Sequence, residues 1–196
     1  MTEMKKLETD LLDAAKKGDV KTITACVKAG ANVSVRDPNG ATPLLLACAS
    51  GNYYAVKELI EAGADVKAKQ FDGSRPLDVA LIFNFPDIVR LLIAAGCAVY
   101  RNNRNLHLSV LTAVQGQCFD SIREIVKHGY DLNVHTDGYS PIYSALLEGD
   151  IDMVKELFSM GARLTSRSFY DKKLAAQLRV EVAGALRKRL QKRSEN

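Results

Sequence analysis

Residues 37–69 read DPNGATPLLLACASGNYYAVKELIEAGADVKAK, and this stretch contains one complete helix–turn–helix pattern. Its first four residues are those that a type I turn favours, with Asp first, Pro second and Gly fourth. Thr42 is then a good N-cap, and Pro43 suits the first helical position, where no backbone N–H is needed. Gly51 is placed to end this first helix in the left-handed conformation, and Gly63 ends the second helix in the same way.

Neither helix of this unit is long enough to be stable alone. Each has two to three turns, below the roughly 12–15 residues at which isolated helices become marginal in water. The rest of the chain supplies neighbours, because three columns of residues recur at a step of 33 residues, with a last step of 32. The columns are Gly30, Gly63, Gly96, Gly129 and Gly161; Ala14, Ala47, Ala80, Ala113 and Ala145; and Ile23, Val56, Val89, Ile122 and Val154.

These residues resemble the ankyrin repeat, whose pattern is a D-x-x-G turn, T-P-L-H-x-A-A, a Gly, a second helix and G-A-D-V-N. The best match is the unit at residues 37–69, and the resemblance covers about residues 7–165. It implies an all-α solenoid of ankyrin-type helix–turn–helix units with hairpin fingers. It also implies that the fingers and first helices line a concave face, where partners usually bind.

We expect a single ankyrin-repeat domain over residues 1–196. Its predicted parts are an N-terminal capping repeat at 1–36, repeats at 37–69, 70–101, 102–135 and 136–165, and a basic helical C-terminal cap at 166–196.

Two units depart from the repeat pattern. In the third repeat, Asn84 stands where the other units have Gly, and Asn is the next-best residue for a left-handed backbone. In the fourth repeat, Leu106 takes the position of the turn Gly and Ser109 replaces Pro. The sequence therefore predicts an altered, looser finger at residues 101–107.

Composition narrows the class of protein. The chain is 47% hydrophobic and 26% charged, as in folded soluble proteins. It has no apolar run of transmembrane length and no apolar stretch of a secretory signal near the N-terminus, so we expect no membrane insertion. Four cysteines without CxxC spacing indicate reduced, buried thiols. We expect a cytoplasmic or nuclear protein that is monomeric alone.

No catalytic constellation is visible, so we predict no enzyme, no metal site and no cofactor. Cys26 and Cys48 fall in core columns, whereas Cys118 begins a helix and is expected to be more exposed. The three histidines lack the spacing of a zinc site. Asn133 lies where family members can be hydroxylated on Asn; the alternative, which we favour, is a turn residue that forms hydrogen bonds.

Basic charge is concentrated at the C-terminal end. Residues 167–193 contain nine Lys or Arg against two carboxylates, a net charge of +7. One explanation is that these residues form the solvent-exposed face of the C-terminal cap, where cations also suit the end of a helix. The alternative is an acidic partner, a nuclear import signal or nucleic acid, bound through Arg187, Lys188 and Arg189. No aromatic residue interleaves with this basic run, as single-strand binding would need.

The sequence therefore predicts a non-enzymatic protein–protein interaction module, acting as an adaptor, subunit or inhibitor through its concave face. The alternative is a nucleic-acid or acidic-surface binder that uses the basic C-terminal helix. The candidate partner-binding residues are Arg36, Asn39, Leu46, Lys69, Phe71, Asp72, Val79, Ile82, Phe83, Arg101, Arg104, Tyr139 and Leu147. Their apolar members would form a patch beside a basic rim of Arg36, Lys69, Arg101 and Arg104. Ile82 and Phe83 could instead pack under a neighbouring finger.

Overall fold

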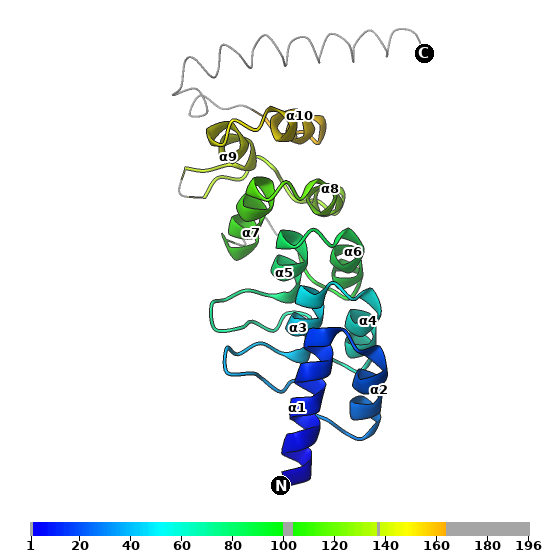
Figure 1. Cartoon of the computed structure of the whole chain (residues 1–196). Helices are drawn as coiled ribbons and strands as arrows, with labels where there is room; N and C mark the ends of the chain where they lie inside the picture. Colours follow the sequence, from blue (N-terminus) through cyan, green and yellow to red (C-terminus); the bar gives the residue numbers. More distant parts are fainter. Residues whose placement is uncertain (1, 100–103, 137, 164–196) are drawn as a thin grey trace, which may run out of the picture. The chain divides into compact units, whose positions relative to one another are not determined.

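The computed structural model describes residues 2–99, 104–136 and 138–163, and these residues form ten α-helices (Figure 1). The helices are α1 (Thr2–Lys17), α2 (Val20–Lys28), α3 (Pro43–Ser50), α4 (Tyr53–Glu61), α5 (Pro76–Ile82), α6 (Pro86–Ala94), α7 (Arg104–Gln115), α8 (Phe119–Lys127), α9 (Pro141–Leu147) and α10 (Ile151–Ser159). The predicted all-α repeat fold is confirmed. None of the described helices has the length and apolar character needed to cross a bilayer.

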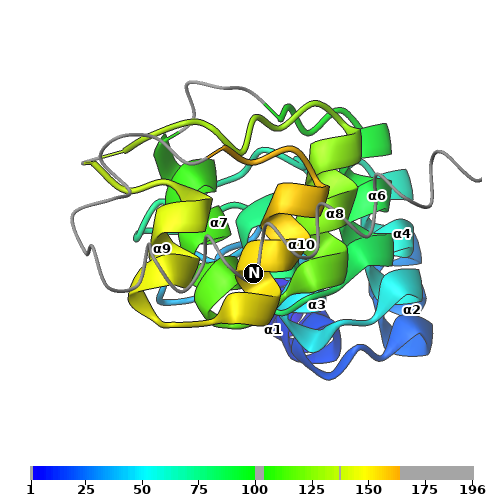
Figure 2. The ribbon, with the colours of Figure 1, turned by 90° about the horizontal axis from the view of Figure 1, so that it is seen from above.

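The chain divides into an N-terminal unit, Met1–Tyr130, and a C-terminal unit, Asp131–Asn196. In the N-terminal unit the first helices α1, α3, α5 and α7 pack on one another, and the second helices α2, α4, α6 and α8 form a parallel column beside them (Figures 1 and 2). Alanines of the predicted small-residue column lie in the first helices with at most 4% of their surface exposed. Small side chains at these positions let successive helices approach closely. The assignment of residues 1–196 to one domain stays a prediction.

The unit at residues 37–69 has the turn and cap chemistry that its sequence predicts. Asp37 Oδ1 accepts hydrogen bonds from the backbone N–H groups of Asn39 and Ala41, at 2.9 and 2.8 Å. Thr42 Oγ1 accepts from the N–H of Leu45 at the start of α3. Gly51 ends α3 with φ at +71°, a left-handed conformation that a residue with a Cβ rarely adopts.

Asn84 adopts the left-handed conformation predicted for it, with φ at +58°. Its side chain does more than tolerate this backbone, because Oδ1 accepts a hydrogen bond from the N–H of Ser121 at 3.2 Å. Ser121 lies in the first turn of α8, where backbone donors have no partner within the helix. Asn84 therefore both ends α5 and caps a helix of the next repeat.

Asn84→Ala should lower the free energy of unfolding by about 1–3 kcal/mol, because alanine is strained at positive φ and cannot accept from Ser121. Asn84→Gly is the matched control, since it keeps the backbone conformation and loses only the hydrogen bond, and it should cost less. Urea denaturation of the three proteins measures both effects. Equal stability of wild type and Asn84→Ala would contradict the assignment.

The fourth repeat corrects the sequence prediction. Residues 104–107 belong to α7 and do not form a looser finger, while 101–103 lie outside the described residues. The cause is Ser109: α3, α5 and α9 all begin at a Pro in the equivalent position, and a Pro disfavours helix in the residue before it. Ser109 imposes no such stop, so α7 begins five residues earlier, at Arg104.

The extended α7 is joined to the preceding repeat by polar contacts. Asn105 Nδ2 donates a hydrogen bond to the backbone oxygen of Gly73 at 3.0 Å. The hydroxyl of Ser109 donates to the backbone oxygen of Asn105 at 3.0 Å and lies close to the carboxylate of Asp78, which is 2% exposed and accepts from the N–H of Arg75. Burial raises the pKa of Asp78, and the hydrogen bond from the N–H of Arg75 opposes that rise. The first turn of α7 therefore occupies a fixed position against the repeat before it.

The C-terminal unit contains α9 and α10, which pack on each other. Within it, Asn133 Oδ1 accepts from the N–H of Arg163 at 2.8 Å, and its Nδ2 donates to Asp131 Oδ1 at 3.1 Å. These contacts fit the interpretation of Asn133 as a turn residue. The predicted helical cap at 166–196, with Arg187, Lys188 and Arg189, lies outside the described residues.

Candidate functional site

Two hairpin fingers, residues 36–41 and 69–74, project on the side of the first helices (Figure 1). We call these fingers, together with the exposed sides of α3 and α5 and the residue that follows α5, Phe83, the finger face. The fingers are joined to each other: the N–H of Phe71 donates to the oxygen of Asn39 at 3.2 Å. Arg36 Nη1 donates to the oxygen of Lys69 at 2.7 Å and to that of Gly40 in its own finger. The guanidinium of the exposed Arg36 therefore holds two fingers in register.

Phe71 is the most exposed large apolar side chain among the described residues, at 78%. Its ring lies across Gly40, since a Cβ built at Gly40 would come within 2.6 Å of the ring. Gly40 also has φ at +79°, so this position needs glycine for two reasons. The contact fixes one side of the Phe71 ring and leaves the other side open to a partner.

Phe83 follows α5 directly and is 56% exposed, so it is a surface residue. Its ring stacks on that of Phe85, with centroids 6.3 Å apart and an angle of 22° between the rings. Phe85 in turn lies against Gly51, where a Cβ would overlap the ring. Phe83 is thus held at the surface by a stack that rests on the preceding repeat. Ile82 beside it is half-buried.

The other predicted partner-binding residues fall into four groups. Asn39, Lys69 and Asp72 are exposed on the fingers, and Leu46 and Val79 are half-buried on α3 and α5. Arg104 is exposed but begins α7 and is not on a finger, which corrects its predicted place in the rim. Tyr139 and Leu147 are exposed in the C-terminal unit. Arg101 lies outside the described residues.

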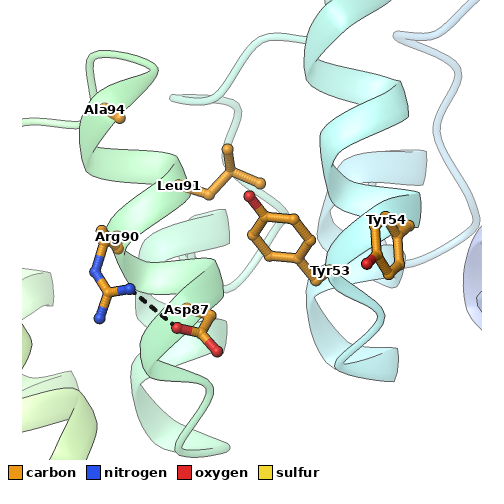
Figure 3. Close-up of a pocket in the computed structure, with 6 residues that line it drawn as sticks. All are labelled: Tyr53, Tyr54, Asp87, Arg90, Leu91 and Ala94. Atoms are coloured by element: carbon orange, nitrogen blue, oxygen red, sulfur yellow. Dashed lines mark hydrogen bonds and ion pairs between the residues drawn. The ribbon is translucent and has the colours of Figure 1, made fainter.

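A groove on the side of the second helices was not predicted from the sequence. It lies between α4 and α6 and has a volume of about 500 Å³ (Figure 3). Its lining residues are Tyr53, Tyr54, Asp87, Arg90, Leu91 and Ala94. The signal available in the sequence was the pair of adjacent tyrosines at the start of α4. Figure 3 shows Tyr53 on one wall, with Asp87 and Arg90 on the other.

Arg90 joins two successive second helices. Its Nε donates to Glu124 Oε1 at 3.0 Å, its Nη2 donates to Glu124 Oε2 at 3.2 Å, and its Nη1 donates to Asp87 Oδ1 at 3.1 Å. The Glu124 side chain, on α8, is only 5% exposed. The hydrogen bonds from Arg90 lower the pKa of Glu124, and Glu124 raises that of Arg90. This bidentate pair fixes α6 against α8.

Glu124→Gln should lower the free energy of unfolding at pH 7 by about 1–2 kcal/mol, because charge-assisted hydrogen bonds become neutral ones. The folded-state pKa of Glu124 is depressed, so its contribution is present above its ordinary pKa and disappears as pH falls through the folded value. The difference between the proteins should therefore shrink below about pH 4.3. Thermal unfolding between pH 3 and 8 measures it, and a gap independent of pH would contradict the role of this charge.

The cysteines do not form a reactive site. All four are buried, so the prediction that Cys118 is more exposed is wrong. Its thiol turns inward and donates to the oxygen of Ile82 at 3.2 Å. The thiol of Cys97 donates to the oxygen of Val66, and burial raises its pKa to about 11. These thiols are protonated at neutral pH and poor nucleophiles. Among the residues described, no three His, Cys, Asp or Glu side chains are grouped to hold a metal.

The comparison with protein families agrees with this architecture. Residues 11–103 match the family model for ankyrin repeats in three copies. A comparison with curated proteins found no match. The stacked helix pairs, the hairpin fingers and this match identify residues 11–103 as ankyrin repeats. Ankyrin repeats generally mediate protein–protein interactions and are typically without enzymatic activity.

Proposed function

We propose that the protein is a non-enzymatic interaction module whose finger face binds a protein partner, as an adaptor, a subunit or an inhibitor. The observation that carries this proposal is the exposure of two aromatic side chains, Phe71 and Phe83, on the finger face. Large aromatic residues are frequent anchors of interfaces because each one removes much apolar area from water. We expect this binding in the cytoplasm or the nucleus, by a protein that is monomeric before it binds.

The finger face is held in shape before any partner arrives. Phe71 rests on Gly40, and Phe83 rests on Phe85. The Arg36 hydrogen bonds tie the two fingers together. Ordering such groups during association would cost free energy, so a surface that is already ordered leaves more of the contact energy for affinity. The half-buried Leu46, Val79 and Ile82 extend the apolar character along α3 and α5.

Phe83→Glu should weaken binding of the finger-face partner by about 2 kcal/mol or more, the size expected for loss of an aromatic hot spot. Because Phe83 is 56% exposed, the melting temperature should stay within a few degrees of wild type. Affinity capture from the native cell with quantitative mass spectrometry identifies the partner, and calorimetry of the purified pair gives the affinity.

Tyr54→Glu is the matched control, since it places the same charge on an exposed aromatic position of the second-helix side. It should leave binding of the finger-face partner unchanged. A Phe83→Glu protein that remains folded and binds normally would move the site elsewhere. The nucleic-acid alternative depends on Arg187, Lys188 and Arg189 and stays a prediction.

A further inference from the structure

We infer that the groove between α4 and α6 is a second binding site, which receives a Lys or Arg side chain from a basic segment of a partner polypeptide. The groove opens on the second-helix side, whereas the fingers project from the first-helix side (Figure 1). The site is therefore additional to the finger face, and one molecule would be able to engage both surfaces.

The size of the groove suits a side chain together with part of its backbone. Its volume of about 500 Å³ falls within the range of about 300–1,000 Å³ that is usual for ligand sites. The rings of Tyr53 and Tyr54 stand edge to face, with centroids 5.5 Å apart. Leu91 and Ala94 add apolar surface, against which the methylene stem of a long cationic side chain would pack.

The charges in the groove favour a cation over an anion. Arg90 is the only cation among the lining residues, and its Nε, Nη1 and Nη2 each donate to a carboxylate. An anion would have to displace Asp87 or the buried Glu124 from Arg90. In the described contacts Asp87 accepts only from Arg90, through Oδ1, and its side chain is 72% exposed. Asp87 Oδ2 is therefore open to a second cation.

The other charged groups near the groove pair with residues other than Asp87 in the described contacts. Lys127 and His128 lie against Glu124 on α8, 3.4 and 3.7 Å from its carboxylate. Lys57, on α4, pairs with Glu61 at 3.7 Å. The carboxylate of Asp87, which is bound through one oxygen only, is thus the acceptor in the groove that is left for a second cation.

The two tyrosines, like Asp87, favour a cation in the groove. The face of an aromatic ring carries partial negative charge and attracts an ammonium or guanidinium group within about 6 Å of its centre. Tyr53 is 38% exposed and Tyr54 is 68% exposed, so a single small cation would leave much of both rings in water. A polypeptide would cover the remaining surface of both rings with the residues that flank its Lys or Arg. Tyr and Arg are also among the residue types that are enriched at interface hot spots.

The test uses a phage-displayed library of random 12-residue peptides. The library is selected on the full-length wild-type chain and counter-selected on the Tyr54→Ala, Asp87→Asn double variant. We expect the surviving peptides to share a Lys or Arg. Each single variant should weaken the best peptide about fivefold or more, and replacing that cationic residue by Glu should abolish binding.

Asp120→Asn is the matched control. Asp120 occupies the equivalent position of α8, 33 residues after Asp87, and pairs with Arg123 in the same way at 2.8 Å, but it does not line the groove. Neither Asp120→Asn nor Phe83→Glu should alter peptide affinity. The melting temperature of every variant is measured, and a single variant replaces the double one if the latter does not fold.

Three results would overturn the inference. The first is that no peptide distinguishes wild type from the groove variants. The second is that the groove-dependent peptides are neutral or acidic, the latter assigning the groove to anions through Arg90. The third is that Asp120→Asn weakens binding as much as Asp87→Asn does.

Discussion

Ala80→Arg should lower the free energy of unfolding by about 4 kcal/mol or more. Ala80 is 0% exposed and lies on α5, which packs against α3 on one side and α7 on the other. An arginine there would force a long side chain into a close-packed interface and would place an unpaired charge away from water. Both effects act at the interfaces through which one repeat stabilises the next.

Differential scanning calorimetry and urea denaturation measure this loss, with an expected drop in melting temperature of about 10 °C or more. Ala49→Arg is the matched control, because Ala49 lies on the exposed side of the neighbouring first helix α3. It should change stability by only about 0.5 kcal/mol. Equal melting temperatures for Ala80→Arg and wild type would show that the alanine column does not form the interface.

The features of the fold that the sequence predicted are those set by local backbone chemistry. Thr42 can cap only the helix that follows it, and Gly51 and Asn84 are among the few residues that tolerate positive φ. Each signal acts within about four residues of its own position, so spacing in the sequence suffices to place it. The recurring apolar columns then decide which helix faces are buried.

The prediction of a looser finger at the start of α7 is wrong because it assumes that a segment without the turn Gly and Pro has a less fixed backbone. Without a Gly at position 106 and a Pro at 109, the sequence appeared to lack the residues that fix a finger. Physically, the missing Pro removes a stop to helix formation, and Leu106 then has a core position to occupy. Cys118 was misjudged for a related reason, since a helix start does not reveal that the thiol turns under the end of α5.

The groove depends on relations that a repeat pattern does not contain. Tyr53 and Tyr54 are adjacent in sequence, but their opposite wall comes from α6. Arg90 meets Glu124 across 34 residues, and both are polar positions that a sequence reading assigns to a solvated surface. Only the stacking of the second helices shows that this arginine is neutralised and that Asp87 is left with an open oxygen.

Leu106→Gly should destabilise the protein by about 4–6 kcal/mol. The side chain of Leu106 is 0% exposed, and truncating a buried leucine leaves a cavity that costs about 3–5 kcal/mol. Glycine inside the helix α7 adds about 1 kcal/mol of backbone entropy. A finger at residues 101–107 would give the opposite result, because glycine would then restore the residue found in the turns at Gly40 and Gly73.

Leu108→Gly separates the cavity from the helix effect. Leu108 lies two residues further along α7 and is 44% exposed, so this variant mainly loses helix propensity and should cost about 1 kcal/mol. Urea denaturation of both variants and wild type gives the two differences. A Leu106→Gly protein as stable as wild type would mean that this segment is a finger after all, whereas a loss several times that of Leu108→Gly establishes the first turn of α7 as part of the core.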